Sequence, residues 1–232
     1  MSLENSLKKI RNFIVSRYGN NLAALLVFGS ANTGHFQYGR SDIDTIILLK
    51  KLDGLDLEKE MNFLIESLKS ENFRTQYFHT LEGIKEYVKK RVSWSTRITI
   101  LSKEGSRVLY STLEFEKLKG WLIDNFPSKE EIMRYVTEKD KVELDGYFKE
   151  IKNFELTKAL MSHIRRKLQV IHYFKTGKLV FDYDKCLNNT DLSDNEKEKL
   201  MFLYKTYEKG GRLSKKQIDG YFDFAKQFTE RI

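Results

Sequence analysis

Apolar positions in the first half of the chain alternate between helical spacing and short unbroken runs. A first series recurs every three or four residues, which predicts a helix that ends at Gly19. Its members are Leu3, Leu7, Ile10 and Ile14. Two runs, 23–28 and 45–49, are short and almost wholly apolar, as in strands buried on both faces. The same reading predicts helices near 57–68 and 81–88, a strand at 73–79, and a hairpin of 97–101 with 107–110.

The pattern becomes helical throughout after Pro127, the only proline of the chain. Three segments place Ser three residues before Glu or Gln, which is the spacing of a helix-capping box. They are Ser128–Glu131, Ser193–Glu196 and Ser214–Gln217. Each precedes apolar residues at helical spacing, so we expect a bundle of about four helices. The sequence therefore predicts two domains, 1–126 with helices and strands and 127–232 all helical.

Composition narrows the class of protein. The 232 residues are 41% hydrophobic and 32% charged, which suffices for a core and excludes a disordered chain. One cysteine, Cys186, excludes an internal disulfide and a Cys-dominated zinc cluster. No apolar run approaches the ~20 residues of a membrane span, and residues 1–17 lack the apolar block of a secretory signal. We expect a cytoplasmic protein without a membrane partner, whose net charge of +8 suits an anionic ligand such as a nucleotide or RNA.

The candidate chemistry lies around the two apolar runs. The first run ends at Gly29-Ser30, where a missing side chain and the start of a helical turn would let a phosphate approach backbone amides. Eleven residues later, Asp42 and Asp44 flank Ile43 at the entry to the second run, so their side chains should share one face. Two neighbouring carboxylates repel each other unless a cation lies between them, and Mg²⁺ prefers such oxygen ligands.

This order of elements resembles the DNA polymerase beta-like nucleotidyltransferase superfamily, with the minimal and aminoglycoside nucleotidyltransferases as the most similar branches. The resemblance covers about residues 22–112. It implies an α+β fold, in which a mixed β-sheet flanked by helices is followed by a helical bundle like that of the aminoglycoside-modifying members. It also implies an enzyme that uses Mg²⁺ to transfer a nucleoside monophosphate from a nucleoside triphosphate, with ATP favoured, to an acceptor hydroxyl or phosphate, releasing pyrophosphate.

The resemblance assigns roles to particular residues. Gly29 and Ser30 would hold triphosphate oxygens, and Asp42 and Asp44 would ligate magnesium and carry the catalysis. Arg40 and Ser41, directly before the pair, are further candidates for nucleotide binding, because an arginine there could contact phosphate oxygens. The acceptor could be a small molecule, an RNA or a protein, and the sequence leaves a homodimer open.

One departure from the superfamily concerns the third carboxylate, which family members carry on the next core strand. Here that strand, 73–79, contains no acid. Gln76 or His79 could stand in its place, and Gln76 is favoured as a metal ligand because its amide oxygen most resembles a carboxylate oxygen. Strict alternation would put Thr75, Tyr77 and His79 on one face and Arg74, Gln76 and Phe78 on the other.

Two alternatives remain beside an active enzyme with this metal site. An acid could arrive from elsewhere in the chain, the candidates being Glu71, Glu82, Glu114, Glu143 and Asp145. Otherwise the chain could be a catalytically degenerate nucleotide-binding or antitoxin-like module of the same fold. The spacing of Arg166 and His172 also resembles that of helical HEPN-type RNases, although six residues do not share one helical face.

Overall fold

The computed structural model describes residues 2–33, 36–38, 41–144 and 154–229. The chain divides into two compact units, 1–126 and 127–232, and each is described by itself.

Four strands form a single mixed sheet in the first unit. In spatial order they are β3 (Phe73–Thr80), β2 (Ile43–Leu49), β1 (Leu22–Phe28) and β4 (Ser106–Ser111). The central strand β1 is antiparallel to both β2 and β4, whereas β2 and β3 are parallel. This sheet, with its flanking helices and the helical second unit, confirms the α+β fold class.

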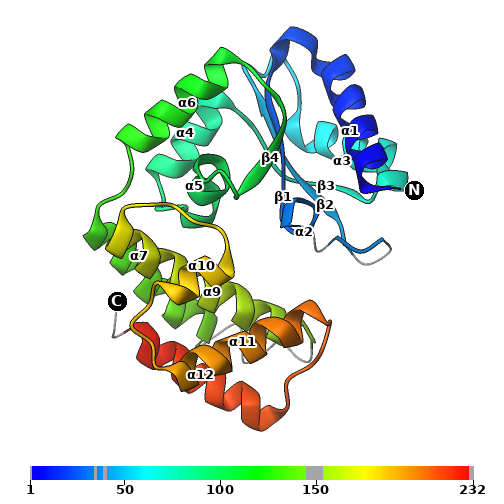
Figure 1. Ribbon diagram of the computed structural model, residues 1–232. Helices are drawn as coiled ribbons and strands as arrows, with labels where there is room; N and C mark the ends of the chain where they lie inside the picture. Colours follow the sequence, from blue (N-terminus) through cyan, green and yellow to red (C-terminus); the bar gives the residue numbers. More distant parts are fainter. Residues whose placement is uncertain (1, 34–35, 39–40, 145–153, 230–232) are drawn as a thin grey trace. The chain divides into compact units, whose positions relative to one another are not determined.

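Helices cover both faces of the sheet (Figure 1). Apolar side chains of α1 (Leu3–Tyr18) and α3 (Leu57–Ser67) pack on one face. Those of α4 (Leu81–Lys89), α5 (Trp94–Leu101) and α6 (Leu113–Asp124) pack on the other. The two central strands are thus buried on both sides, which explains their continuous apolar runs. Short turns complete the unit: α2 (Ser30–Thr33) and the 3₁₀ turns Gly19–Asn21 and Lys69–Glu71.

The expected hairpin of 97–101 with 107–110 is wrong. Residues 97–101 belong to α5, and the strand that follows, β4, pairs with β1 instead. The β-branched residues of this segment resemble a strand, but tertiary contacts decide its structure. Arg97 is buried and donates hydrogen bonds to the carbonyl oxygens of Val92, Leu122 and Val88, at 2.9, 3.3 and 3.2 Å. A guanidinium with several donors satisfies carbonyls near the ends of neighbouring helices, and this role requires the helical placement. Helix α6 was not among the predicted elements either.

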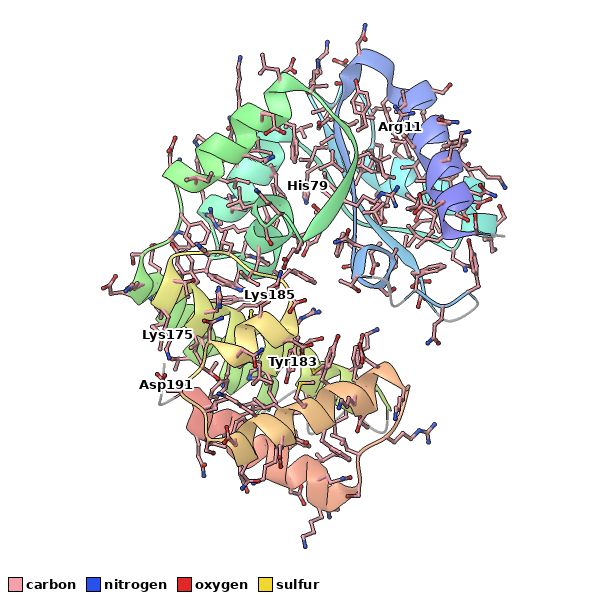
Figure 2. All side chains as sticks on the ribbon, viewed as in Figure 1. Arg11, His79, Lys175, Tyr183, Lys185 and Asp191 are labelled. Carbon is pink, nitrogen blue, oxygen red and sulfur yellow. The ribbon has the colours of Figure 1, made fainter. Side chains whose placement is uncertain are left out.

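A carboxylate network joins α1 to α3. Glu60 of α3 is buried and accepts hydrogen bonds from Tyr18, at 2.7 Å, and from two nitrogens of Arg17. The Arg17 guanidinium also lies 4.0 Å from the centroid of the Phe63 ring. Because every charge here has a partner, the network tolerates burial that an isolated carboxylate would not. On the opposite edge, Arg11 of α1 donates to the Leu109 carbonyl of β4 at 2.9 Å (Figure 2).

The second unit is helical. It contains α7 (Lys129–Val142), α9 (Phe154–Thr176), α10 (Tyr183–Asn188), α11 (Asp194–Glu208) and α12 (Lys215–Thr229). All three predicted capping boxes form, each with reciprocal backbone–side-chain hydrogen bonds. The short helix α10 was not predicted. Cys186, on that helix, is buried in the core, and its thiol donates to the Val180 carbonyl at 3.5 Å.

Polar ties hold the bundle together beside its apolar core. Lys175 of α9 forms an ion pair with Asp191, in the segment between α10 and α11 (Figure 2). Lys167 of α9 is fully buried, and its ammonium group donates to the Ala225 carbonyl of α12.

None of the helices in the described ranges is long and apolar enough to cross a membrane.

We expect Glu60→Gln to lower the free energy of unfolding of the first unit by about 1–3 kcal/mol, because an amide nitrogen would face the donors of Arg17 and Tyr18. Urea denaturation followed by tryptophan fluorescence measures this directly, since both tryptophans, Trp94 and Trp121, lie in that unit. The hydrogen bond from Arg17 lowers the pKa of Glu60 below its ordinary 4.5. The stabilisation is therefore complete above about pH 4.5 and disappears as the pH falls further.

Glu66→Gln is the matched control, because this residue of the same helix makes an exposed ion pair with Lys69. We expect a change below about 0.5 kcal/mol. The assigned network would be contradicted if both variants lost the same free energy of unfolding. It would also be contradicted if the loss in Glu60→Gln stayed the same as the pH falls below about 4.5.

Candidate functional site

Asp42 and Asp44 lie at the start of β2, on the face covered by α4, α5 and α6. Ile43 between them is fully buried in the core formed with α1 and α3, so the two carboxylates point to the opposite side of the sheet. Asp44 is half-buried and stands opposite Phe28 of β1 and Arg74 of β3. Asp42 comes directly before the strand, and its side chain is 56% exposed.

The turn after β1 brings Gly29 against Asp44. Gly29 has a φ of +68°, and a Cβ atom built there would stand 3.0 Å from the Asp44 carboxylate oxygen Oδ2. Glycine is thus favoured both by backbone conformation and by the neighbouring carboxylate. Ser30 begins α2 directly afterwards, and the Asn32 side chain anchors this helix to the Glu104 carbonyl at 2.8 Å. The predicted phosphate turn and the predicted metal carboxylate are therefore adjacent.

A β-bulge in β3 changes which side chains face the aspartates. Thr45 pairs with Thr75, but Ile46 pairs with Tyr77, which leaves Gln76 as the extra residue. Tyr77 consequently packs with the core on the α4 side, and Phe78 packs on the α1 side. The expectation of strict alternation along 73–79 is therefore wrong beyond Thr75. Bulges often re-aim side chains next to functional sites.

Two donors from β3 cover the two carboxylates. The Gln76 amide nitrogen Nε2 donates to Asp44 Oδ1 at 2.9 Å, and Arg74 Nη1 lies 3.5 Å from Asp42 Oδ2. His79, by contrast, pairs with Leu48, four residues beyond Asp44 and therefore about 13 Å away along the strand. It lies beside Tyr87 of α4, with ring centroids 5.8 Å apart, and burial lowers its pKa (Figure 2). Of the two candidates on this strand, the structure brings Gln76 and not His79 to the aspartates.

The described alternative acids have partners of their own. Glu71 pairs with Lys9 at 2.9 Å, Glu82 with Lys85 at 3.2 Å and Glu114 with Lys50 at 3.0 Å. Within the described ranges, no three His, Cys, Asp or Glu side chains come together as a metal cluster. Asp145 lies outside the described residues.

Glu143, in the second unit, is paired in the same way. It accepts from His163 Nδ1 at 2.6 Å and from Arg166 Nη1 at 3.1 Å. Burial opposes its ionisation, but the His163 hydrogen bond and the Arg166 charge prevail and lower the pKa of Glu143 to about 2. With Arg166 bound to this carboxylate and His172 buried, the RNase-like spacing has an ordinary structural explanation.

Just before Asp42, Ser41 forms two hydrogen bonds with Gln37. The Ser41 hydroxyl accepts the Gln37 N–H at 3.1 Å, and the Ser41 N–H donates to the Gln37 carbonyl at 2.8 Å. The Tyr38 hydroxyl lies 3.1 Å from that of Ser6 on α1, which ties this loop to the helix. Ser41 is thus engaged in shaping the loop, and Arg40 lies outside the described residues.

The donor set at this end of the sheet fits one hard divalent cation. Asp42 and Asp44 supply carboxylate oxygens from one face, and rotation of the Gln76 amide would present its oxygen where its nitrogen now donates. Arg74 adds a positive charge beside Asp42.

Comparison with solved structures gives one match of the same overall fold and one weaker match. The spectinomycin adenyltransferase AAD(9) from Enterococcus faecialis, solved with ATP and spectinomycin, matches with a TM-score of 0.60 at 13% identity over 98% of each chain. A toxin–antitoxin structure with AMP-PNP matches 61% of this chain and 95% of its own at 17% identity, with a TM-score of 0.34. No curated protein matches the sequence. The model of the nucleotidyltransferase domain matches residues 7–170, well over half of the sequence, and the chain therefore belongs to the nucleotidyltransferase family.

Proposed function

We propose that the protein transfers a nucleoside monophosphate from a nucleoside triphosphate, with ATP favoured, to an acceptor hydroxyl or phosphate. Mg²⁺ is the metal and pyrophosphate the second product. One observation supports this proposal above the others: the Gly29 turn, the Asp44 carboxylate and the Gln76 amide meet at one end of the sheet in a member of the nucleotidyltransferase family. The adenyltransferase neighbour solved with ATP makes ATP the first nucleotide to test.

In the proposed reaction, an acceptor oxygen bonds to the α-phosphorus while the bond from that phosphorus to the bridging oxygen of the β-phosphate breaks. Pyrophosphate leaves with the electron pair. Asp42 and Asp44 would hold Mg²⁺, which when bound neutralises phosphate charge and stabilises the leaving oxygen. The Gly29–Ser30 turn would hold triphosphate oxygens through its amides and hydroxyl. Positioning and charge, rather than covalent chemistry by the protein, would supply most of the rate.

The proton of a hydroxyl acceptor needs a base. The Gln76 amide cannot take it up at neutral pH, and the Asp42 and Asp44 carboxylates would already be engaged with the metal. An acceptor phosphate is already ionised and needs no base. The proposed enzyme is therefore better equipped for an ionised acceptor oxygen than for a neutral alcohol.

A second candidate function is a nucleotide-binding module that has lost catalysis. The observation in its favour is Gln76 of β3, which donates to Asp44 and lies on the strand where the superfamily resemblance implies an acid. Such a module would bind nucleotide with the same aspartates but would release no pyrophosphate.

Asp44→Asn should reduce pyrophosphate release roughly a hundredfold or more, above the 10–100-fold typical of outer-shell partners of a metal. The assay uses each of the four common NTPs with Mg²⁺, and acceptors that include spectinomycin, total RNA and protein extract. The variant should be as stable as wild type or slightly more so, because one of two like charges is lost. Asp124→Asn, at the exposed end of α6, is the control. If Asp44→Asn releases pyrophosphate at the wild-type rate, the metal assignment is refuted. If the wild-type protein binds nucleotide but releases no pyrophosphate with any acceptor, the second candidate function is favoured.

Gly29→Ala should weaken binding of a non-hydrolysable ATP analogue with Mg²⁺, because the new Cβ would displace the Asp44 carboxylate. Gly54→Ala is a matched control, since Gly54 has a φ of +78° and open space around its Cβ position. Both variants should lose about 1–2 kcal/mol of stability from the left-handed backbone. Titration calorimetry should show weaker binding only in Gly29→Ala, and equal affinities would argue against the phosphate turn.

Gln76→Glu should make the stability of the protein depend on Mg²⁺. A carboxylate would replace the amide that now donates to Asp44 at 2.9 Å, and the two negative charges would repel each other without a cation. Without Mg²⁺, the midpoint temperature of thermal unfolding should therefore be lower than that of wild type, and it should rise when Mg²⁺ is added. Gln227→Glu, an exposed position on α12, should show no such response, and similar curves for both variants would exclude Gln76 from the metal site.

A further inference from the structure

The charged side chains around the aspartate pair leave it less negative than a site built from acids alone. Asp42 and Asp44 carry two negative charges, and the Arg74 guanidinium, 3.5 Å from Asp42, carries one positive charge. Gln76, in the place where a third acid would stand, carries none. Over these four described side chains, Asp42, Asp44, Arg74 and Gln76, the charges sum to one net negative charge.

We propose that Arg74 is a built-in cation of this site, which takes the place of a second divalent ion and limits the aspartate pair to one. This inference rests on the proposed function, because it assumes that Asp42 and Asp44 hold a divalent cation. A triphosphate brings further negative charge, which one divalent ion and one guanidinium compensate together. A guanidinium stays charged at any physiological pH, so the contribution is permanent.

The position of Arg74 favours this role over a structural one. Arg74 and Asp42 are 59% and 56% exposed, so their contact stabilises the fold little. The Arg17 pair, in contrast, has a buried carboxylate and joins two helices, and Arg107 joins β4 to α1 through Glu4 at 2.6 Å. Arg74 instead lies opposite Asp44 in the parallel ladder and reaches the carboxylate two residues before it. Its backbone is held in the ladder, and its largely exposed side chain is open to a ligand at the same end of the sheet.

The charge has a measurable consequence for metal binding. A positive charge a few ångströms from a carboxylate competes with a divalent ion for it, even where water screens the interaction. Removal of that charge should therefore tighten binding of a bare ion to the aspartate pair. Substitution by lysine keeps the charge and should preserve the wild-type affinity. A structural role would predict no difference between the neutral and the charged substitutions.

The experiment titrates the full-length protein with Mn²⁺ and follows free Mn²⁺ by electron paramagnetic resonance. Wild type should bind one ion that is lost in the Asp42→Asn, Asp44→Asn double variant. Arg74→Gln should bind Mn²⁺ roughly five- to tenfold more tightly, as expected for loss of one nearby charge. Arg74→Lys should match wild type. Arg107→Gln, which removes a guanidinium paired with a carboxylate elsewhere in the same unit, should also match it.

The outcomes separate the two proposals. Equal Mn²⁺ affinity in wild type and Arg74→Gln would overturn the role of Arg74 and leave the proposed function intact. Two Asp-dependent ions in wild type would also overturn it. Absence of any Asp-dependent Mn²⁺ binding would overturn both the metal site of the proposed function and this inference. Thermal unfolding of each variant tests whether the compared proteins are folded. If Arg74→Gln does not fold, Arg74→Lys still tests the role of the charge, since its Mn²⁺ affinity should equal that of wild type.

Discussion

An ionised carboxylate cannot enter the two-sided core of this sheet without partners, and that constraint places the site. Along β2, residues Ile46 to Leu49 are fully buried, and helices cover both faces of the strand. The polar Thr45 is tolerated because its hydroxyl donates to the Arg74 carbonyl at 3.2 Å. Asp44 lies one residue nearer the strand entry, where the core on the α4 side ends and water and side-chain donors can reach it. The chemistry proposed for the unit is therefore assigned to the end of the sheet where Gly29, Asp44 and Gln76 meet.

Two mostly buried carboxylates differ from Asp42 in how fully their charges are compensated. Glu60 in the first unit and Glu143 in the second are mostly buried and receive hydrogen bonds from an arginine and a second residue. These interactions hold the pKa of each below its ordinary range, so the charges serve the fold. Asp42 is more than half exposed, with a longer contact to Arg74. A carboxylate held this loosely contributes little to stability and can exchange its partner for an ion.

Hydrophobic periodicity predicted most of the sheet and helices, because the number of buried faces of an element determines the spacing of its apolar residues. The apolar runs became β1 and β2, and the three Ser-x-x-Glu/Gln segments became capped helices. Local pattern failed where a distant contact decides the structure. The β-branched stretch at 98–100 is helical, next to the buried Arg97 that serves carbonyls from separate segments. The bulge at Gln76 could not be predicted from the local sequence pattern either, since it depends on how β3 pairs with β2.

The candidate site could be predicted in part for the same reason. Asp42, Asp44 and Gly29 follow from strand ends and spacing, and the structure brings Gly29 and Asp44 together. Arg74 was not foreseen as a neighbour of Asp42, because an exposed arginine on an edge strand carries no signal of its own. Replacing an acid by an amide at residue 76 removes a charge and a base together, and Arg74 makes the pair less negative still. Under the proposed function, the site then has enough compensation for a triphosphate with one metal ion but little capacity to ionise a neutral alcohol. An acceptor whose oxygen already carries negative charge would be matched on both counts, because it needs no base and Arg74 offsets its repulsion from the triphosphate.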